Sequence, residues 1–235
     1  MISLASFTTP THRCVYLPSE QATMRYEMVV QCTREELQSR LDAGWRRFGH
    51  AFFRPVCETC RGCQSLRVPI STFRSNRSQR RAVRDNQDLE LRIGPAQATR
   101  EKLRLYDRFH EHQVEAKGWP EHDPKDVKSY RETFVEGPLP TEEWCYYLDG
   151  ILIAVGYVDV VPRGLSAIYF YYDPDHRDRS LGTFNVMRIL EEVARRNMPF
   201  GYLGYFVEGC PSVSYKKNFG PNEVIGPDGK WVPFR

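Results

Sequence analysis

The pattern of hydrophobic and polar positions predicts alternating strands and helices along the 235-residue chain. In the first ninety residues, the expected strands are 24–31, 46–54, 66–70 and 88–93. A capping box formed by Thr33 and Glu36 predicts a short helix after the first strand. Ser75 or Asn76 is expected to cap a second helix. This segment reads as a compact α+β module that ends at Gly94-Pro95.

The pattern changes after this point. Residues 97–117 read as a helix, and His122-Asp123-Pro124 is expected to begin another, with Asp at the N-cap and Pro at the first helical position. Asp149-Gly150 predicts a tight hairpin. The expected elements around and after it are strands 143–148, 151–161, 165–172 and 200–206 and a helix over 181–197. This order is typical of an α/β domain, so we expect a small domain over 1–94 and an α/β domain over 95–235.

Composition narrows the class of protein. No apolar run approaches the ~20 residues that cross a bilayer, and the mean hydropathy is −0.55. The first residues lack the basic and apolar regions of a secretory signal, which predicts a cytoplasmic protein with no membrane partner.

The formal charge of +3 is unevenly distributed. Residues 45–84 hold ten Arg, no Lys and one acid, a net charge of +9, which favours a polyanion such as RNA as partner.

Four of these arginines share one face of the second predicted helix. They are Arg77, Arg80, Arg81 and Arg84, at the spacing i, i+3, i+4, i+7. We interpret this stripe as an RNA-docking surface, and a solvated basic helix face is the alternative.

A cysteine loop lies within the same basic segment. Cys57-x2-Cys60-x2-Cys63 could direct three sulfurs at one Zn ion or iron–sulfur cluster, with Cys14 as the best remote fourth ligand. Seven cysteines, an odd number, fit thiols or ligands in a reducing compartment better than disulfides. The alternative is a reduced loop without metal, in which the cysteines pack as small apolar residues.

Two further segments carry candidate chemistry. The loop from Arg177 to Thr183 opens a helix, where free backbone N–H groups favour anions, and Ser180 and Gly182 would let a ligand approach the backbone. The aromatic strand 202–206, followed by a Lys pair at 216–217, suggests a strand edge that opens into a pocket with cationic walls.

At this point the sequence resembles a known family. The segments 45–50, 53–55, 66–69 and 78–81, with the cysteine triplet, resemble the N-terminal domain of the aminoacyl-tRNA–protein transferases of the N-end rule. The segments 171–174, 180–182, 202–205 and 215–216 resemble the C-terminal domain of that family. The chain length and the single cysteine loop are more similar to the bacterial leucyltransferases than to the longer eukaryotic arginyltransferases.

The resemblance implies a GNAT-like C-terminal domain that binds aminoacyl-tRNA instead of acetyl-CoA. It implies transfer of Leu from Leu-tRNA to proteins that begin with Asp or Glu, which marks them for degradation. The transfer chemistry needs no cofactor, and a metal at the cysteine loop would be structural or regulatory. The alternatives are an arginyl donor, an acetyl-CoA-dependent acetyltransferase and a non-catalytic RNA-binding or metal-sensing protein.

The resemblance also suggests roles for individual residues. Asp173 is the expected proton-handling or orienting carboxylate, and Tyr172 and Tyr205 are expected to hydrogen-bond at the reacting centre. The acceptor carboxylate needs a cation. The candidates in the matching motifs are Arg177, Arg179, Lys216 and Lys217. The four arginines of the striped helix are expected to bind the tRNA.

Overall fold

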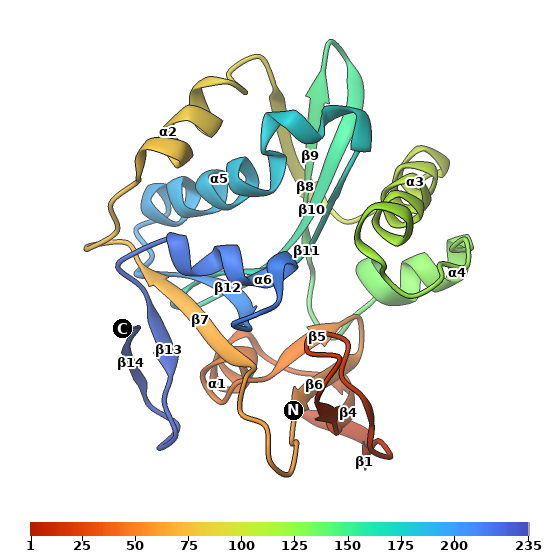
Figure 1. Cartoon of the computed structure of the whole chain (residues 1–235), viewed down its shortest axis with the longest axis vertical. Helices are drawn as coiled ribbons and strands as arrows, with labels where there is room; N and C mark the ends of the chain where they lie inside the picture. Colours follow the sequence, from red (N-terminus) through yellow and green to blue (C-terminus); the bar gives the residue numbers. More distant parts are fainter. Residues whose placement is uncertain (235) are drawn as a thin grey trace.

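An eight-stranded mixed sheet runs through the computed structural model, which describes residues 1–234 (Figure 1). Its strands, in spatial order, are β14 (Trp231–Pro233), β13 (Glu223–Ile225), β7 (Gln64–Pro69), β12 (Phe200–Phe206), β11 (Gly164–Tyr172), β10 (Ile151–Val161), β9 (Glu142–Leu148) and β8 (Glu90–Pro95). The pair β11–β12 is parallel and all other neighbours are antiparallel.

Helices cover both faces of this sheet (Figure 1). On one face, α5 (Leu181–Arg195) packs against β11 and β12 and carries α2 (Arg77–Arg84) on its outer side. On the other face lies α3 (Arg100–Lys117), followed by α4 (Val127–Tyr130) and a π-helical turn (Arg131–Val135). The structure is therefore an α/β fold with a sheet between two helical layers, as predicted from the order of elements.

The two apolar faces of the sheet form separate parts of the core. Ile189 and Val193 of α5 pack with Leu165 on one face. Phe109 of α3 packs with Tyr171 on the other. Side chains alternate between the two faces along each strand, and a register shift in the β10–β11 pair at Tyr157/Val158 lets β11 place Leu165 on one face and Tyr171 on the other. Among residues 1–234, no helix is long and apolar enough to cross a membrane.

A smaller antiparallel sheet lies at the bottom of the view in Figure 1. Its strands, in order, are β1 (Ile2–Thr8), β4 (Met24–Gln31), β6 (Ala51–Pro55) and β5 (Arg46–Phe48). Helix α1 (Arg34–Asp42) lies between β4 and β5 in sequence and contacts β10 of the large sheet. A separate two-stranded ladder joins β2 (His12–Arg13) to β3 (Gln21–Ala22).

The first ninety-four residues also contribute to the large sheet. β7 pairs with β12 in antiparallel register, with Arg67 opposite Tyr202, and β8 forms the edge beside β9. The boundary predicted near residue 94 therefore does not coincide with a boundary between the two sheets. The basic helix α2 accordingly lies on α5, away from the small sheet (Figure 1).

Most predicted elements are confirmed, with local differences. The capping box of Thr33 and Glu36 forms as predicted, and Asn76 is the cap that begins α2. The predicted strand over 46–54 is wrong as a single element, because Gly49 at φ +52° turns the chain between β5 and β6. The helix expected to begin at 122–124 is also wrong. His122 bonds to a carboxylate of α3, and the helix begins only after its cap at residue 126.

Candidate functional site: a cleft between two splayed strands

The parallel strands β11 and β12 separate and leave a cleft between them. Their pairing covers only Gly164–Ser166 opposite Phe200–Tyr202, although both strands continue beyond it. A cleft of about 510 Å³ lies between their diverging ends and the start of α5. Beyond this pairing, β11 and β12 have no ladder partner on the edges that face each other, so backbone groups on these two edges are available to a ligand.

Aromatic side chains form one wall of the cleft. Phe109 and Trp119 reach it from the α3 side, and Tyr169 and Tyr172 reach it from β11. Burial raises the pKa of Tyr172, which keeps its hydroxyl protonated at neutral pH. The hydroxyl of Tyr169 lies 2.8 Å from Nε2 of His110, a histidine whose pKa is lowered by burial. This wall suits an apolar group with few polar contacts.

The start of α5 forms a second side of the cleft. Ser180, Gly182 and Thr183 line it, as does Arg177 from the preceding 3₁₀ helix. Ser180 has a φ of +56°, and its side chain does not cap the helix. The first residues of α5 therefore line the cleft, and no side chain caps their backbone N–H groups.

The opposite wall carries two cations, the buried Arg46 and the half-buried Lys216. Lys216 donates a hydrogen bond of 3.1 Å from Nζ to the carbonyl oxygen of Tyr205. Burial lowers the pKa of Lys216 to about 7, and the charge of Arg46 contributes to this shift. Arg46 comes from β5 of the small sheet, lies over the ring of Tyr205 and lines the same cleft. Its pKa is also lowered by burial.

The structure thus brings together six of the residues singled out in the sequence. Those that line the cleft are Tyr172, Tyr205, Arg177, Ser180, Gly182 and Lys216. Arg46 was missed as a site residue. Its motif contributed to the family resemblance, but two adjacent arginines there gave no sign of which one faces a ligand.

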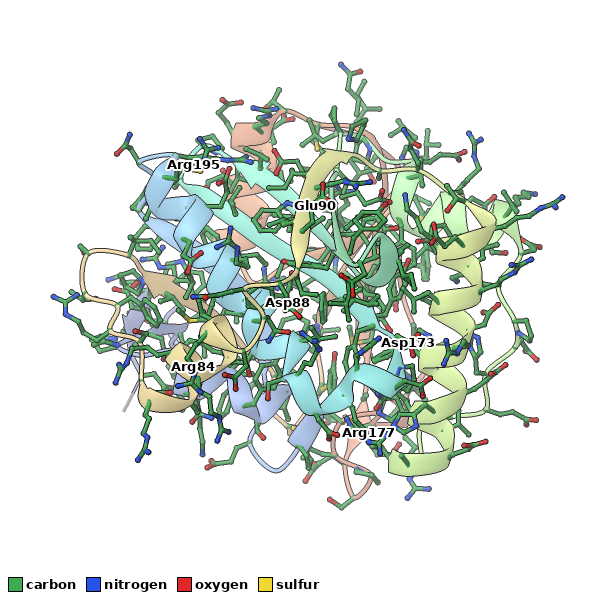
Figure 2. The ribbon with its side chains drawn as sticks, turned by 90° about the horizontal axis from the view of Figure 1, so that it is seen from above. Arg84, Asp88, Glu90, Asp173, Arg177 and Arg195 are labelled. Carbon is green, nitrogen blue, oxygen red and sulfur yellow. The ribbon has the colours of Figure 1, made fainter. Side chains whose placement is uncertain are left out.

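Three predicted site residues do not line the cleft. The carboxylate of Asp173 accepts hydrogen bonds from Arg108 Nη1 at 2.8 Å and from the backbone N–H of Asp175 at 3.0 Å, and it lies beside α3 (Figure 2). Asp173 therefore fixes the loop before α5 and does not line the cleft, and its proton-handling role stays a prediction. The side chain of Lys217 is exposed outside it.

Arg179, the third, is part of a structural link. It binds both carboxylate oxygens of Asp88 at 2.9 Å, and these hydrogen bonds hold the pKa of Asp88 below its ordinary value. Asn86 supports the same link, because its Nδ2 donates to the Arg179 carbonyl oxygen at 2.8 Å. Figure 2 shows Asp88 between Arg84 and the loop that carries Arg177. The end of α2 is thereby fastened to the loop that begins the cleft.

The role predicted for the Tyr205 hydroxyl also changes. This hydroxyl donates to the carbonyl oxygen of Gly44 at 2.9 Å, so it anchors the chain after α1. Burial raises the pKa of Tyr205 above its ordinary value. The ring and the backbone carbonyl of Tyr205 contribute to the cleft, whereas its hydroxyl is already engaged.

The arginine stripe forms as predicted. Arg77, Arg80, Arg81 and Arg84 line one shallow depression on α2. Asp85 pairs with the last of them. The surface is strongly basic, and it is joined to the cleft through the link between Asp88 and Arg179. Its contact with tRNA stays a prediction.

The four cysteines predicted to bind a metal line one cavity of about 840 Å³ next to the cleft. Within residues 1–234, however, no three His, Cys, Asp or Glu side chains come close enough to hold a metal ion. The sulfurs of Cys14 and Cys60 accept hydrogen bonds from nearby backbone N–H groups, at 3.4 Å each. Burial raises the pKa of Cys63 to about 12, so without a metal this residue is a thiol at neutral pH. The cysteine sulfurs therefore do not converge on one point in this structure, and a metal at the cysteine loop stays a prediction.

Comparison with known proteins places the chain in a family. Residues 12–81 match the family model "Arginine-tRNA-protein transferase, N terminus", and residues 101–226 match the corresponding C-terminal model. The aspartate/glutamate leucyltransferase of Marinobacter nauticus is 37% identical over 232 residues, which are 97% of this chain and 95% of that protein. The enzyme of the same name from Campylobacter jejuni is 34% identical over 220 residues, 93% of this chain and 92% of that protein.

The chain therefore belongs to the aminoacyl-tRNA–protein transferases, a family of aminoacyltransferases. Within it, the chain is similar to the bacterial aspartate/glutamate leucyltransferases over almost its whole length. The alternatives of an acetyl-CoA-dependent acetyltransferase and of a non-catalytic binding protein are not favoured.

The fold agrees with this assignment. The solved structure of FemX superposes with a TM-score of 0.51 at 10% sequence identity, covering 81% of this chain and 66% of that one. This likeness concerns the fold alone, and it supports the predicted GNAT-like architecture.

Proposed function

We propose that the protein transfers Leu from Leu-tRNA to the N-terminal Asp or Glu of acceptor proteins. The names of its relatives support the donor and the acceptor, and the cleft supplies a place where the two could meet. The product would begin with Leu, which the N-end rule treats as a signal for degradation. Because the donor is a charged tRNA, the reaction belongs in the cytoplasm.

The chemistry is an acyl transfer from an ester to an amine. The acceptor's α-amine attacks the ester carbonyl of the leucyl group, a C–N bond forms, and the C–O bond to the tRNA ribose breaks. The proton lost by the amine balances the one gained by the departing ribose oxygen. An α-amine has a pKa of about 8, so a usable fraction is neutral at pH 7 and no strong base is required. Alignment of the two substrates can then supply much of the rate.

The walls of the cleft suggest how the donor lies. The aromatic wall with Phe109, Trp119 and Tyr172 fits the leucyl side chain, which is apolar. The free N–H groups at the start of α5 suit the developing negative charge on the ester carbonyl oxygen. The rest of the tRNA would extend toward the stripe on α2, where exposed arginines suit phosphates.

One observation carries this proposal. β11 and β12 separate beyond Ser166 and leave a cleft that is aromatic on one side and cationic on the other. An aminoacyl donor is apolar and positively charged at its own amine, whereas the acceptor is acidic. A cleft with two chemically different walls fits that pair of substrates better than it fits a single ligand.

The test offers three labelled donors to the purified protein: Leu-tRNA, Arg-tRNA and acetyl-CoA. The acceptors are peptides that begin with Asp, Glu or Lys and are otherwise identical. We expect label to move only from Leu-tRNA and only to the Asp and Glu peptides. Transfer from Arg-tRNA would correct the donor, and transfer from acetyl-CoA, or none from any donor, would overturn the proposal.

A further inference from the structure

Arg46 is a buried arginine without any hydrogen-bond partner for its side chain. The residue is 8% exposed, and Nε, Nη1 and Nη2 are all buried and unpaired among the described residues 1–234. A guanidinium carries five N–H donors, and leaving them unsatisfied in the interior costs free energy. Native proteins seldom keep such a group unless a ligand or solvent completes it.

The acidic side chain held by the neighbouring arginine is already engaged. Asp159 is bound by Arg47 through both carboxylate oxygens, with Nε to Oδ2 at 2.9 Å. Arg47 also donates to the carbonyl oxygen of Gly49 and to the hydroxyl of Thr141. The charge of Asp159 is therefore already balanced, and Arg46 retains an uncompensated positive charge.

Lys216 adds a second positive charge at the same place. A Cβ built on Gly204 would lie 3.3 Å from Lys216 Nζ and 3.9 Å from Arg46 Nε, so both cations approach one point of β12. Gly204 has a φ of +84°, a conformation that favours glycine. Lys216 uses one of its three donors on the Tyr205 carbonyl, which leaves two for a ligand. Both cations line the cleft.

We propose that Arg46 and Lys216 together bind the side-chain carboxylate of the acceptor's N-terminal Asp or Glu. This inference rests on the proposed function and names the residues that would determine its acceptor specificity. The planar fork of a guanidinium matches the two oxygens of a carboxylate. The ammonium of Lys216 can donate to the same carboxylate, because both cations lie beside Gly204 of β12. A bound carboxylate would supply the missing counter-charge and the missing hydrogen bonds in one step.

The placement of the pair favours a carboxylate over a tRNA phosphate. Arg46 is buried over the Tyr205 ring, 5.6 Å from its centroid, within a cleft between β-strands. The arginines suited to a phosphate backbone lie on the surface of α2 instead. The donor carries an α-ammonium, which these two cations would repel, so the donor is expected at the aromatic wall and the acidic acceptor at this one.

The test compares Arg46→Met and Lys216→Met with the unchanged protein. Initial rates of leucyl transfer from Leu-tRNA are measured against paired peptides that begin with Asp or Asn, and with Glu or Gln. Hydrogen bonds to charged groups predict a rise in KM for the Asp and Glu peptides of about tenfold to a hundredfold. We expect the preference for Asp over Asn to shrink by a similar factor, with little change in kcat. Lys230→Met, at an exposed lysine in the turn before β14, is the control.

Two charge-keeping variants guard against simple misfolding. Arg46→Lys and Lys216→Arg keep the cation but change its hydrogen-bond geometry, so each should raise the KM for the Asp peptide less than the corresponding Met variant does. Leu-tRNA affinity, measured by filter binding, should stay the same in all four variants.

The outcomes distinguish the inference from the proposed function. If the unchanged protein transfers Leu but both Met variants keep its KM and its preference for Asp, the inference is wrong while the proposed function stands. If the Met variants lose Leu-tRNA affinity instead, the anion is a tRNA phosphate and the inference is again wrong. If the unchanged protein transfers no Leu, the proposed function itself fails.

Discussion

Arg179 and Asp88 join the basic helix α2 to the loop that begins α5, through two hydrogen bonds of 2.9 Å. This bidentate ion pair lies at the surface, where Asp88 is half exposed. It holds α2 at a fixed position relative to the cleft, which matters if one end of a tRNA is bound on the helix and the other in the cleft. Arg179 therefore contributes to geometry and not to the cleft's own charge.

We predict that Arg179→Gln lowers the free energy of unfolding by less than about 1 kcal/mol, because an exposed ion pair is weak. The pKa of Asp88 lies below its ordinary value in the folded protein. The contribution of the pair is therefore complete above the unfolded pKa of about 3.9 and is lost as the pH falls below it. Urea unfolding at pH 7 and pH 3 measures both effects. A greater destabilisation at pH 3 than at pH 7 would contradict the assignment.

The arginine stripe on α2 gives a second prediction. Replacing Arg80 and Arg81 together by Gln should weaken Leu-tRNA binding and reduce the slope of log K against log salt by about 0.7–0.9 for each phosphate that is no longer neutralised. Arg195→Gln is the matched control, because this exposed arginine lies at the far end of α5 (Figure 2). Filter binding between 50 and 200 mM salt, roughly the range in which such slopes are measured, gives the result. An unchanged slope in the double variant would exclude the stripe as the tRNA surface.

The local elements of this fold could be predicted from the sequence, because their causes are local. The capping box at Thr33 and the tight turn at Asp149-Gly150 need only neighbouring residues, and both occur as expected. The pairing of β7 with β12 joins segments more than a hundred residues apart and leaves no local pattern. Loop closure over such distances is decided by the packing of the whole chain.

The site residues also divide into those that local sequence predicts and those that depend on distant segments. Tyr172, Ser180 and Lys216 belong to motifs at strand and helix ends, and the structure places all of them in the cleft. Asp173 belongs to the same motif, yet its partner Arg108 comes from α3, which the sequence does not bring near it. Which polar group is engaged and which is free depends on tertiary partners, and residue type alone does not show them.

The lowered pKa of Lys216 gives a prediction about pH. Lys216 must be charged to bind a carboxylate, and its pKa is about 7 in the free protein. We expect the KM for an Asp peptide to rise as the pH increases from 7 to 9, by up to about tenfold for each unit. The acceptor amine also titrates in this range, so the quantity to compare is the ratio of KM between the unchanged protein and Lys216→Arg. The Arg variant keeps its charge, and the ratio should therefore rise with pH.

The groups that face Lys216 would not cause the KM ratio to rise between pH 7 and pH 9. Arg46 stays charged, and burial raises the pKa of Tyr215 to about 12 and that of Tyr205 above its ordinary value, so both stay neutral. Cys210 is the other group that acts on Lys216, and the comparison is repeated in a Cys210→Ser background to remove it. A ratio that is flat between pH 7 and pH 9 in both backgrounds would show that Lys216 does not bind the acceptor in its charged form.

The lowered pKa of Lys216 also makes the free energy of unfolding depend on pH. The unfolded chain keeps Lys216 protonated up to about pH 10.4, whereas the folded protein releases this proton near pH 7. Between these values the unfolded state binds more protons, so this residue makes the free energy of unfolding rise with pH. Lys216→Met should remove that part of the slope, as measured by urea unfolding at pH 7, 8 and 9. A slope unchanged by the substitution would contradict the lowered pKa.

The last prediction concerns two adjacent arginines with opposite surroundings. The side chains of Arg47 and Asp159 are both 2% exposed and bind each other, whereas Arg46 has no partner for any guanidinium nitrogen within residues 1–234. Arg47→Met leaves a buried carboxylate uncompensated and should cost about 3–5 kcal/mol of unfolding free energy. Arg46→Met removes an unpaired buried charge, so it should change stability by less than about 1 kcal/mol or increase it.

Urea unfolding of both variants, compared at unchanged m-value, measures this contrast. The double variant Arg47→Met with Asp159→Leu should recover much of the stability, because it removes both charges together. Arg47, which stabilises the fold, and Arg46, which we assign to a ligand, would then differ in their effect on the free energy of unfolding, although they are neighbours in β5. If Arg46→Met is as destabilising as Arg47→Met, then Arg46 has a structural partner in solution, and the acceptor carboxylate must be bound elsewhere.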